Sequence, residues 1–226
     1  MTANETPRGR FITFEGGEGA GKSVQSRRLA RRLETLGLTV LRTREPGGSP
    51  LAETLRDALL SGAAAPFGPE GEALLFAAAR IDHLDTAIRP ALARGEWVVC
   101  DRFADSTRAY QGAGGRLPKA FIDALERVAV GATRPDLTLI LDLPSEIGLA
   151  RAARRRGGDG RLDRFEGEGA AFHETLRRAF LAIAADEPDR CAVVDARGDE
   201  EAVGEAIWAA VAGRLGGALP QAERAR

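Results

Sequence analysis

Lysine is almost absent from this sequence. Among its 226 residues are 32 arginines and lysines, and only Lys22 and Lys119 are lysines. The guanine-reading motif Asn-Lys-x-Asp needs a lysine after asparagine, but the two lysines follow Gly21 and Pro118. The sequence therefore excludes a GTPase that reads guanine through this motif. In so arginine-rich a chain, a lysine kept at one position indicates that a compact ammonium group is needed there.

Cysteine and long apolar stretches are also scarce. Cys100 and Cys191, the only two cysteines, each lie in a short apolar run typical of a strand. We therefore expect two buried free thiols rather than a disulfide or a metal site. No apolar run reaches the length of a membrane span, and residues 1–10 are polar and lack the apolar core of a secretion signal. These features predict a cytoplasmic protein.

Neither sign of charge dominates the chain. The net charge is −1 at pH 7, which provides no overall attraction to nucleic acid or to an acidic membrane surface. We expect neither of these as a partner. Apolar residues make up 44% and charged residues 29% of the chain, which is typical of a globular protein.

Segments typical of strands alternate with segments of helical periodicity, without an internal repeat or a long linker. This order predicts one α/β domain over 1–226, with a five-stranded parallel sheet covered by helices on both faces. The predicted strands span 10–14, 39–42, 97–100, 137–141 and 192–194. The predicted helices span 22–36, 51–61, 71–93, 118–130, 145–156, 169–185 and 200–215. The tail at 216–226 is predicted to be frayed.

The first predicted strand leads directly into a glycine-rich loop and then a helix. Residues 16–23 match the phosphate-binding pattern G-x-x-x-x-G-K-[ST]. Backbone N–H groups and the helix N-terminus attract phosphate in such a loop. Lys22 would reach the outer phosphates of ATP, and the Ser23 hydroxyl would bind Mg²⁺. The candidate ATP-binding residues are Gly16, Gly17, Glu18, Gly19, Ala20, Gly21, Lys22 and Ser23.

Further candidates follow the other strands, because parallel sheets bind ligands at the carboxyl ends of their strands. Asp101 and Arg102 follow the third strand. The carboxylate suits Mg²⁺ or its waters, and the guanidinium suits a phosphoryl group. Arg44 and Glu45 follow the second strand, either lining a cleft or forming a solvated ion pair beside a turn. Arg56 lies off the apolar stripe of its helix. It is either a phosphate ligand or a solvated side chain.

Phe76 and Arg80 are four residues apart in a predicted helix, so they share one face. An aromatic ring beside a guanidinium suits a nucleobase, which stacks on the ring and accepts a hydrogen bond at a carbonyl. The alternative is a core phenylalanine with an arginine that snorkels beside it.

The stretch 150–164 interrupts the strand and helix pattern, because it is rich first in arginine and then in glycine. It is either a solvated charged face or a mobile arginine lid that closes over a triphosphate. Asp142, at the end of the fourth strand, could support Mg²⁺ indirectly or cap the helix that follows Pro144, and we expect the cap.

The sequence offers no pair of a base and a nucleophile, since His83 and His173 lie in predicted helices without an evident partner. A hydroxyl acceptor would need a group that takes its proton. A phosphate monoester is already largely an anion at pH 7, so it needs only positioning and neutralisation of charge. The arginines therefore indicate a phosphotransferase with a phosphate-bearing acceptor.

From about residue 10 to about residue 210, the chain resembles the bacterial thymidylate kinases. The resemblance rests on the following motifs: Phe14-Glu15-Gly16 before the glycine loop, Thr43-Arg44-Glu45-Pro46-Gly47-Gly48, Phe76 with Ala78-Ala79-Arg80, Asp101-Arg102, Tyr110-Gln111-Gly112, Arg134-Pro135-Asp136-Leu137 and the arginine-rich stretch. It implies a P-loop NTPase fold, transfer of the ATP γ-phosphate to dTMP with Mg²⁺, and a homodimer. The helix at 71–93 is our expected dimer contact.

The resemblance also implies roles for single residues. Arg102 would bridge the two reacting phosphates, with Glu18 near it and near the sugar 3′-hydroxyl. Asp101 would lie near Mg²⁺ beside Ser23. Phe76 would stack on thymine. The remaining acceptor contacts would be Glu45, Arg56 at the dTMP phosphate, Arg80 at the O4 of thymine, Thr107 at the base and Tyr110 against the 2′ position. The lid arginines, among them Arg151, Arg154 and Arg161, would close on ATP, because the loop itself carries Glu18 and Gly19 and no arginine.

Two other readings remain open at this point. A kinase for AMP, CMP or another nucleotide would share the fold and the phosphate chemistry, and would differ at Phe76, Arg80, Thr107 and Tyr110. A binding module without catalysis would keep the phosphate loop. The intact set of Lys22, Ser23, Asp101 and Arg102 argues against it.

Overall fold

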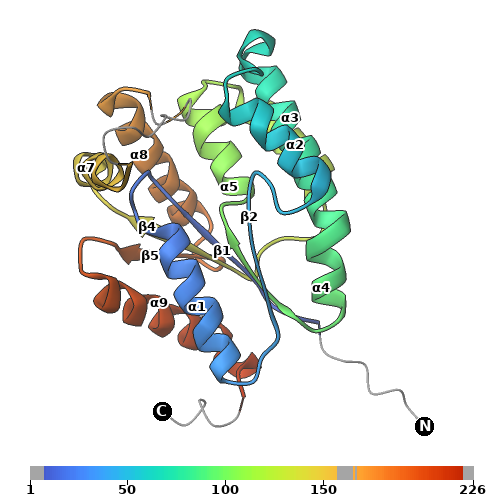
Figure 1. The fold of residues 1–226 in the computed structure, drawn as a ribbon, viewed down its shortest axis with the longest axis vertical. Coiled ribbons are helices and arrows are strands. Elements are labelled where there is room, and N and C mark those ends of the chain that lie inside the picture. Colours follow the sequence, from blue (N-terminus) through green and yellow to red (C-terminus); the bar gives the residue numbers. More distant parts are fainter. Residues whose placement is uncertain (1–7, 157–164, 166, 221–226) are drawn as a thin grey trace.

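A five-stranded parallel sheet forms the centre of the molecule (Figure 1). The computed structural model describes residues 8–156, 165 and 167–220. The strand order is β2-β3-β1-β4-β5, and every neighbouring pair runs parallel. The predicted fold class is therefore confirmed. Within the described residues, no helix is both long enough and apolar enough to cross a membrane.

All five predicted strands are present and differ from the prediction by at most two residues at an end. They are β1 Phe11–Gly16, β2 Val40–Arg44, β3 Trp97–Asp101, β4 Leu137–Asp142 and β5 Cys191–Asp195. β1 is buried along its whole length, because it lies in the middle of the sheet and both faces are covered.

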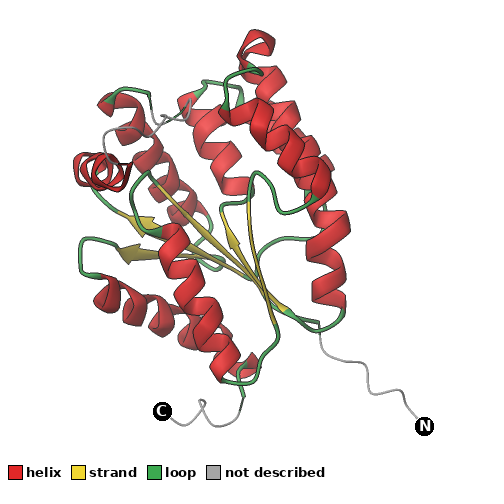
Figure 2. Ribbon diagram, in the orientation of Figure 1, coloured by secondary structure: helices red, strands yellow, loops and turns green. Residues whose placement is uncertain are grey.

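All seven predicted helical segments are also helical in the structure (Figure 2). The α-helices are α1 Lys22–Thr35, α2 Pro50–Leu60, α3 Gly68–His83, α4 Arg89–Ala93, α5 Ala104–Thr107, α6 Lys119–Ala129, α7 Ser145–Arg156, α8 Ala170–Asp186 and α9 Glu200–Leu215. Shorter turns lie at η1 Ala65–Phe67 and η4 Gly216–Ala218, and π-helical turns at η2 Leu84–Ile88 and η3 Arg108–Gly114.

Two helical details differ from the prediction. The segment 71–93 is not one regular helix, because the π-helical turn η2 separates α3 from α4. Pro90 explains the interruption, since a proline lacks the N–H that would bond to Thr86 and its ring clashes with that carbonyl. α5 and η3 are not predicted from the sequence, because their polar residues resemble a turn.

The side chains of β1 alternate between two cores. Ile12 and Phe14 pack with residues of α1 and α9 on one face of the sheet. Phe11 packs on the other face in a second apolar cluster, which includes Cys100 and Phe103. Both cysteines are buried and free, as predicted.

The prediction of a frayed tail is wrong for residues 216–219. Leu219 is only 1% exposed and belongs to the core under α1 and α9. The short turn η4 carries the chain back onto that core after α9. Residues 221–226 lie outside the described part of the chain.

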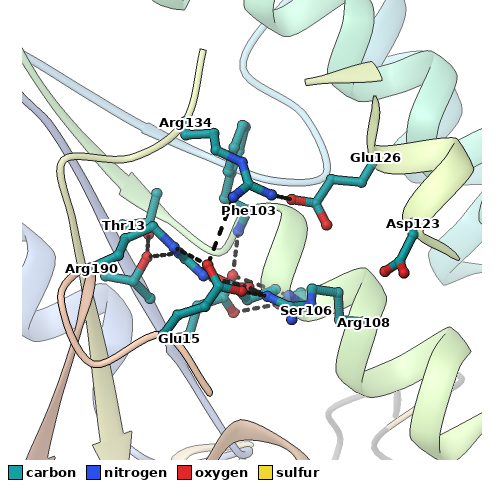
Figure 3. A network of polar contacts seen from close by, with 12 residues as sticks. Thr13, Glu15, Phe103, Ser106, Arg108, Asp123, Glu126, Arg134 and Arg190 are labelled. Atoms are coloured by element: carbon teal, nitrogen blue, oxygen red, sulfur yellow. Dashed lines mark hydrogen bonds and ion pairs between the residues drawn. The ribbon is translucent and has the colours of Figure 1, made fainter. Parts of the chain in front are cut away.

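A buried carboxylate joins the end of β1 to the start of α5. Glu15 is fully buried, and its Oε1 accepts hydrogen bonds from the backbone N–H groups of Phe103, at 2.8 Å, and Ser106, at 3.1 Å. Its Oε2 accepts from the Ser106 hydroxyl at 2.7 Å. The carboxylate therefore fixes the distance between the strand that enters the glycine loop and the helix that follows β3 (Figure 3).

The polar network continues from α5 to β4 and to Arg190, which directly precedes β5 (Figure 3). Asp105 is 3% exposed and pairs with Arg190 at 2.7 Å and with Arg108 at 2.9 Å. Arg190 also donates to the Thr138 hydroxyl at 2.6 Å, and Thr138 bonds to Thr13 at 2.8 Å. Three neighbouring parts of the fold, β1, β4 and the start of β5, are thus tied to α5.

Glu15 makes stability depend on pH. Its burial, together with the charge of Asp105, raises its pKa from 4.5 to about 7. The folded state therefore holds a proton more tightly than the unfolded state, so this contribution to stability is complete below pH 4.5 and is lost as the pH rises through about 7. Glu15→Gln removes this titration.

We expect the free energy of unfolding of the wild type, minus that of the Gln variant, to fall by up to about 3 kcal/mol between about pH 4.5 and pH 8. Urea unfolding at a series of pH values measures it. A difference that stays constant over this range would show that Glu15 titrates at its ordinary value.

Candidate active site

The glycine loop packs on α7 through main-chain atoms. A Cβ at Gly19 would lie 2.0 Å from the carbonyl oxygen of Gly148, and a Cβ at Gly148 would lie 2.2 Å from that of Glu18. Gly19 also has a φ of 68°, which residues other than glycine rarely adopt. The contact therefore requires glycine on both sides, and it places the loop against the helix that carries the arginines.

Lys22 lies inside the loop and is 7% exposed. Its Nζ donates to the carbonyl oxygens of Gly16, at 3.1 Å, and Gly17, at 2.7 Å. Burial, with a smaller effect of Arg102, lowers the pKa of Lys22 to about 8. The ammonium group is therefore held against the main chain of the glycine loop itself.

Ser23 and Asp101 meet at the mouth of the loop. The Ser23 hydroxyl donates to Oδ2 of Asp101, which ends β3 beside β1. A hydroxyl and a carboxylate are oxygen ligands of the kind that Mg²⁺ prefers. The described residues contain no cluster of three or more His, Cys, Asp or Glu side chains that would hold a metal alone, so most ligands of such an ion would come from phosphate and water.

Glu18 is an internal counter-ion for two arginines. Its Oε2 lies 3.7 Å from Arg102 NH2, and its Oε1 accepts from Arg155 NH2 at 2.9 Å. Burial would raise the pKa of Glu18, but Lys22, Arg102 and Arg155 together lower it to about 2. The carboxylate is therefore ionised and holds both cations beside the loop.

Arg102 lies between the loop and a neighbouring cavity. Its φ of 70° is unusual for a residue with a side chain. NH1 donates to the Ser106 hydroxyl at 3.3 Å, and the guanidinium carbon lies 5.0 Å from the ring centre of Tyr110. The same Ser106 is held by Glu15, so the network under the sheet also orients Arg102.

An open cavity lies beside Arg102 and is lined by residues of several elements. Its lining contains seven of the predicted site residues: Glu18, Glu45, Phe76, Arg80, Arg102, Thr107 and Tyr110. Arg56 is not among the lining residues, but its NH1 donates to the carbonyl of Pro46, which is, at 2.7 Å. The structure therefore brings seven of the predicted site residues together around one cavity.

Arg80 does not snorkel; it is 4% exposed. Its Nε donates to Oε2 of Glu45 at 2.7 Å, and NH1 and NH2 both donate to the Thr107 hydroxyl at 3.2 Å. NH2 also donates to the carbonyl of Phe103 at 3.1 Å. The interpretation of Glu45 as a solvated partner of Arg44 is wrong, since Arg44 pairs with Glu53 at 2.9 Å.

Aromatic rings form one side of the cavity. Phe76 is half-buried, and its ring centre lies 6.2 Å from that of Phe165. Tyr110 lies edge-on to Phe165 at 5.5 Å and to Phe172 at 6.2 Å. Phe165 is not among the predicted site residues, although a lone aromatic residue directly after a long arginine- and glycine-rich stretch is a usable signal.

Three other residues of this region also escaped the sequence analysis. His83 was assigned no partner, yet it bonds to Glu45 and to Thr43. His173 lines the cavity. Glu15 was noted only as part of a motif. Nothing in the sequence pattern indicated these roles, because each depends on contacts between distant segments.

The predicted lid arginines fall in three different places. Arg151 of α7 donates to the carbonyls of Ala196, at 3.0 Å, and Arg197, at 3.1 Å, in the loop after β5. Arg154 is exposed on the same helix. Arg161 lies outside the described residues, as does most of the predicted lid at 150–164.

The prediction that Asp142 caps the following helix is not supported. Both of its carboxylate oxygens accept from Arg177 of α8, from Nε at 2.6 Å and NH2 at 3.0 Å. The carboxylate therefore ties the end of β4 to α8. Charge pairing between distant segments was the feature that the sequence could not indicate.

Comparison with known proteins gives a consistent result. The family model described as thymidylate kinase matches residues 14–207. The thymidylate kinase of Bradyrhizobium diazoefficiens is 59% identical over 92% of this chain and 91% of its own length. That of Rhodopseudomonas palustris is 60% identical over 94% and 92%.

Among solved structures, the crystal structure of thymidylate kinase from Ehrlichia chaffeensis has a TM-score of 0.74 and 32% sequence identity. The similarity covers 91% of this chain and the whole of that one. Together with the phosphate loop and the adjoining aromatic cavity, these matches show that the chain belongs to the thymidylate kinase family.

Proposed function

We propose that this protein phosphorylates dTMP to dTDP with the γ-phosphate of ATP. One observation carries the proposal most directly. Glu18 and Arg102 lie at the phosphate loop and also line the cavity that contains Phe76 and Arg80. The donor phosphates and the acceptor nucleotide would therefore meet at these two residues.

The donor side consists of the loop and Lys22. Backbone N–H groups of residues 16–23 would surround the phosphates, and the ammonium group would bind the outer ones. The Ser23 hydroxyl and the Asp101 carboxylate, which are already in contact, fit a Mg²⁺ ion that is completed by phosphate and water. Bound Mg²⁺ would neutralise charge on the transferred group.

The acceptor side is the aromatic cavity. Phe76 would stack on the thymine ring, Arg80 would donate to its O4, and Thr107 would contact the base beside Arg80. Tyr110 would lie against the 2′ position of the sugar and favour deoxyribose. Arg56 would bind the phosphate of dTMP. Glu45 acts through Arg80, to which it is hydrogen-bonded.

Arg102 would neutralise charge on both reacting phosphates as the γ-phosphoryl group moves. Its ion pair with Glu18 sets its starting position, and Glu18 would also contact the 3′-hydroxyl. Further cations would come from α7 and the stretch after it, where Arg154, Arg155 and Arg161 occur. The acceptor needs no general base, because its phosphate is already anionic.

The test is ADP release from Mg-ATP with a panel of acceptors: dTMP, dUMP, UMP, CMP, AMP and GMP. A strong preference for dTMP is expected. A preference for another monophosphate would keep the phosphate chemistry and overturn the base contacts of Phe76 and Arg80. Bound ATP without any turnover that depends on an acceptor would overturn the kinase assignment.

The lowered pKa of Lys22 predicts that the use of ATP depends on pH. Its pKa in the free protein is lowered to about 8, so the ammonium group loses its proton as the pH rises through this value. Since kcat/KM reports the free enzyme, we expect kcat/KM for ATP to fall about tenfold per pH unit well above pH 8. A guanidinium keeps its charge, so Lys22→Arg, although slower, should not show this fall. A wild-type profile that stays flat to about pH 9.5 contradicts the prediction.

We also infer that two copies associate through the layer of α2 and α3. Three large apolar side chains are exposed there: Leu51 (53%), Leu74 (53%) and Ile81 (36%). Leu74 and Ile81 are seven residues apart on α3 and therefore share a face. A second copy of this chain could cover these side chains with the same apolar face of its own. This agrees with the homodimer implied by the family resemblance.

Leu74→Glu tests this contact, because it places a charge at an exposed position without disturbing the core. We expect the wild type to sediment as a dimer and this variant as a monomer at micromolar concentration. The control is Val193→Glu on β5, where the side chain is similarly exposed at 50% and the dimer should persist. A wild type that sediments as a monomer, or a dimeric Leu74→Glu variant, overturns the assignment of the interface.

A further inference from the structure

His83 is a fully buried histidine at the end of α3, next to the cavity but not part of its lining. We propose that it is a positioning residue: with Thr43 it holds the Glu45 carboxylate so that Arg80 presents a single N–H group to the base of the acceptor. The proposal rests on the proposed function of the cavity. It adds His83 and Thr43 to the residues that determine which base the cavity accepts.

The chain of contacts has a defined direction. The Arg80 Nε–H donates to Oε2 of Glu45 at 2.7 Å, and His83 Nδ1 lies 3.2 Å from Oε1 of the same carboxylate. An ionised carboxylate only accepts, so Nδ1 carries a proton. Nε2 of the same ring lies 2.7 Å from the Thr43 hydroxyl oxygen, which donates to this nitrogen when the imidazole is neutral. The four side chains thus form one continuous chain of hydrogen bonds.

This chain fixes the plane of the Glu45 carboxylate, because one oxygen is held by Arg80 and the other by His83. Arg80 is then held at three of its nitrogen atoms. Within the described residues, its Nε–H, one N–H of NH1 and both N–H groups of NH2 can be matched to Glu45, Thr107 and Phe103. One N–H of NH1 remains, on a side chain that lines the cavity.

A single fixed donor discriminates between bases. It bonds to the carbonyl at position 4 of thymine, whereas the amino group of cytosine at that position would face it with another donor. Sites that are built to hydrogen-bond one group reject a base that lacks it, because their buried polar atoms would be left unpaired. The discrimination therefore depends on how firmly Arg80 is held.

Gly48 encloses the contact between His83 and Thr43. Its φ is 88°, and a Cβ there would lie 2.4 Å from His83 Nε2 and 2.5 Å from the Thr43 hydroxyl oxygen. The backbone of the loop after β2 therefore lies directly on this hydrogen bond. A side chain at this position would push the histidine or the threonine away. The loop thus closes the chain of contacts at the end opposite to Arg80.

The test compares two substitutions of His83 in the full chain. His83→Leu removes both hydrogen bonds and fills the position with an apolar side chain of moderate size. His83→Asn keeps an N–H near the position of Nδ1–H and loses the contact with Thr43. The measurements are kcat/KM for dTMP and for dCMP, and KM for ATP.

For His83→Leu we expect kcat/KM for dTMP to fall about tenfold to a hundredfold, as for the loss of a hydrogen bond to a charged group. The ratio of dTMP to dCMP should fall about tenfold or more, with KM for ATP unchanged. His83→Asn should recover most of the lost ratio. Thr43→Val, which removes only the hydroxyl, should reduce the ratio as well. In the double variant with His83→Leu, the loss of discrimination should be smaller than the sum of the two single losses.

Leu84→Ala is the matched control. Leu84 follows His83, is fully buried and packs in the apolar cluster with Phe11. Its truncation should lower the thermal unfolding midpoint and leave the ratio of dTMP to dCMP unchanged. If His83→Leu does not fold, Thr43→Val with the Thr43→Ser rescue carries the comparison, since serine restores the hydroxyl.

The outcomes separate the two proposals. A wild type without preference for dTMP overturns the proposed function before His83 is considered. A wild type that prefers dTMP, with a ratio that His83→Leu and Thr43→Val leave unchanged, overturns the role of His83 and leaves the proposed function intact. A ratio that falls equally in Leu84→Ala would show that only stability was affected, which also overturns it.

Discussion

One buried carboxylate, that of Glu15, sets the distance between the two halves of the site. Glu15 is the second-last residue of the strand that enters the phosphate loop. It accepts hydrogen bonds from the segment that begins with Phe103 and carries Thr107 and Tyr110. Arg102 directly precedes this segment. The Glu15 carboxylate therefore connects the strand before the phosphate loop to the segment that lines the cavity. With the proposed function, an acceptor in that cavity would face donor phosphates at the loop.

Charge balance explains how so many arginines are held together before a phosphate arrives. Arg102 and Arg155 share the Glu18 carboxylate, and Arg80 is neutralised by Glu45. An anionic substrate at the loop would compete with Glu18 for the same cations. Since the cations are already oriented, binding costs little rearrangement, which is how arginines contribute most to phosphoryl transfer.

The sequence predicted the architecture well and the supporting contacts poorly. All five strands and the phosphate loop follow from local apolar runs and from the glycine spacing, which are properties of neighbouring residues. Phe76 and Arg80 were also recognisable as a pair, through their spacing in one helix. His83, Glu15 and Asp142 were not, because their partners lie on other elements and charge pairing leaves no periodic signal. Phe165 follows the arginine- and glycine-rich stretch, whose composition does not indicate where the next residues lie in the fold.

The contact between Gly19 and Gly148 restricts how the sequence can change. A methyl group on either residue would meet a main-chain oxygen of the other segment, at 2.0 Å or 2.2 Å. A main-chain atom cannot be trimmed by a second substitution, so an alanine at one position has no compensating change at the other. The two glycines, 129 positions apart in the chain, can therefore be replaced only if the loop and α7 separate, which would also move the arginines of α7 away from the loop.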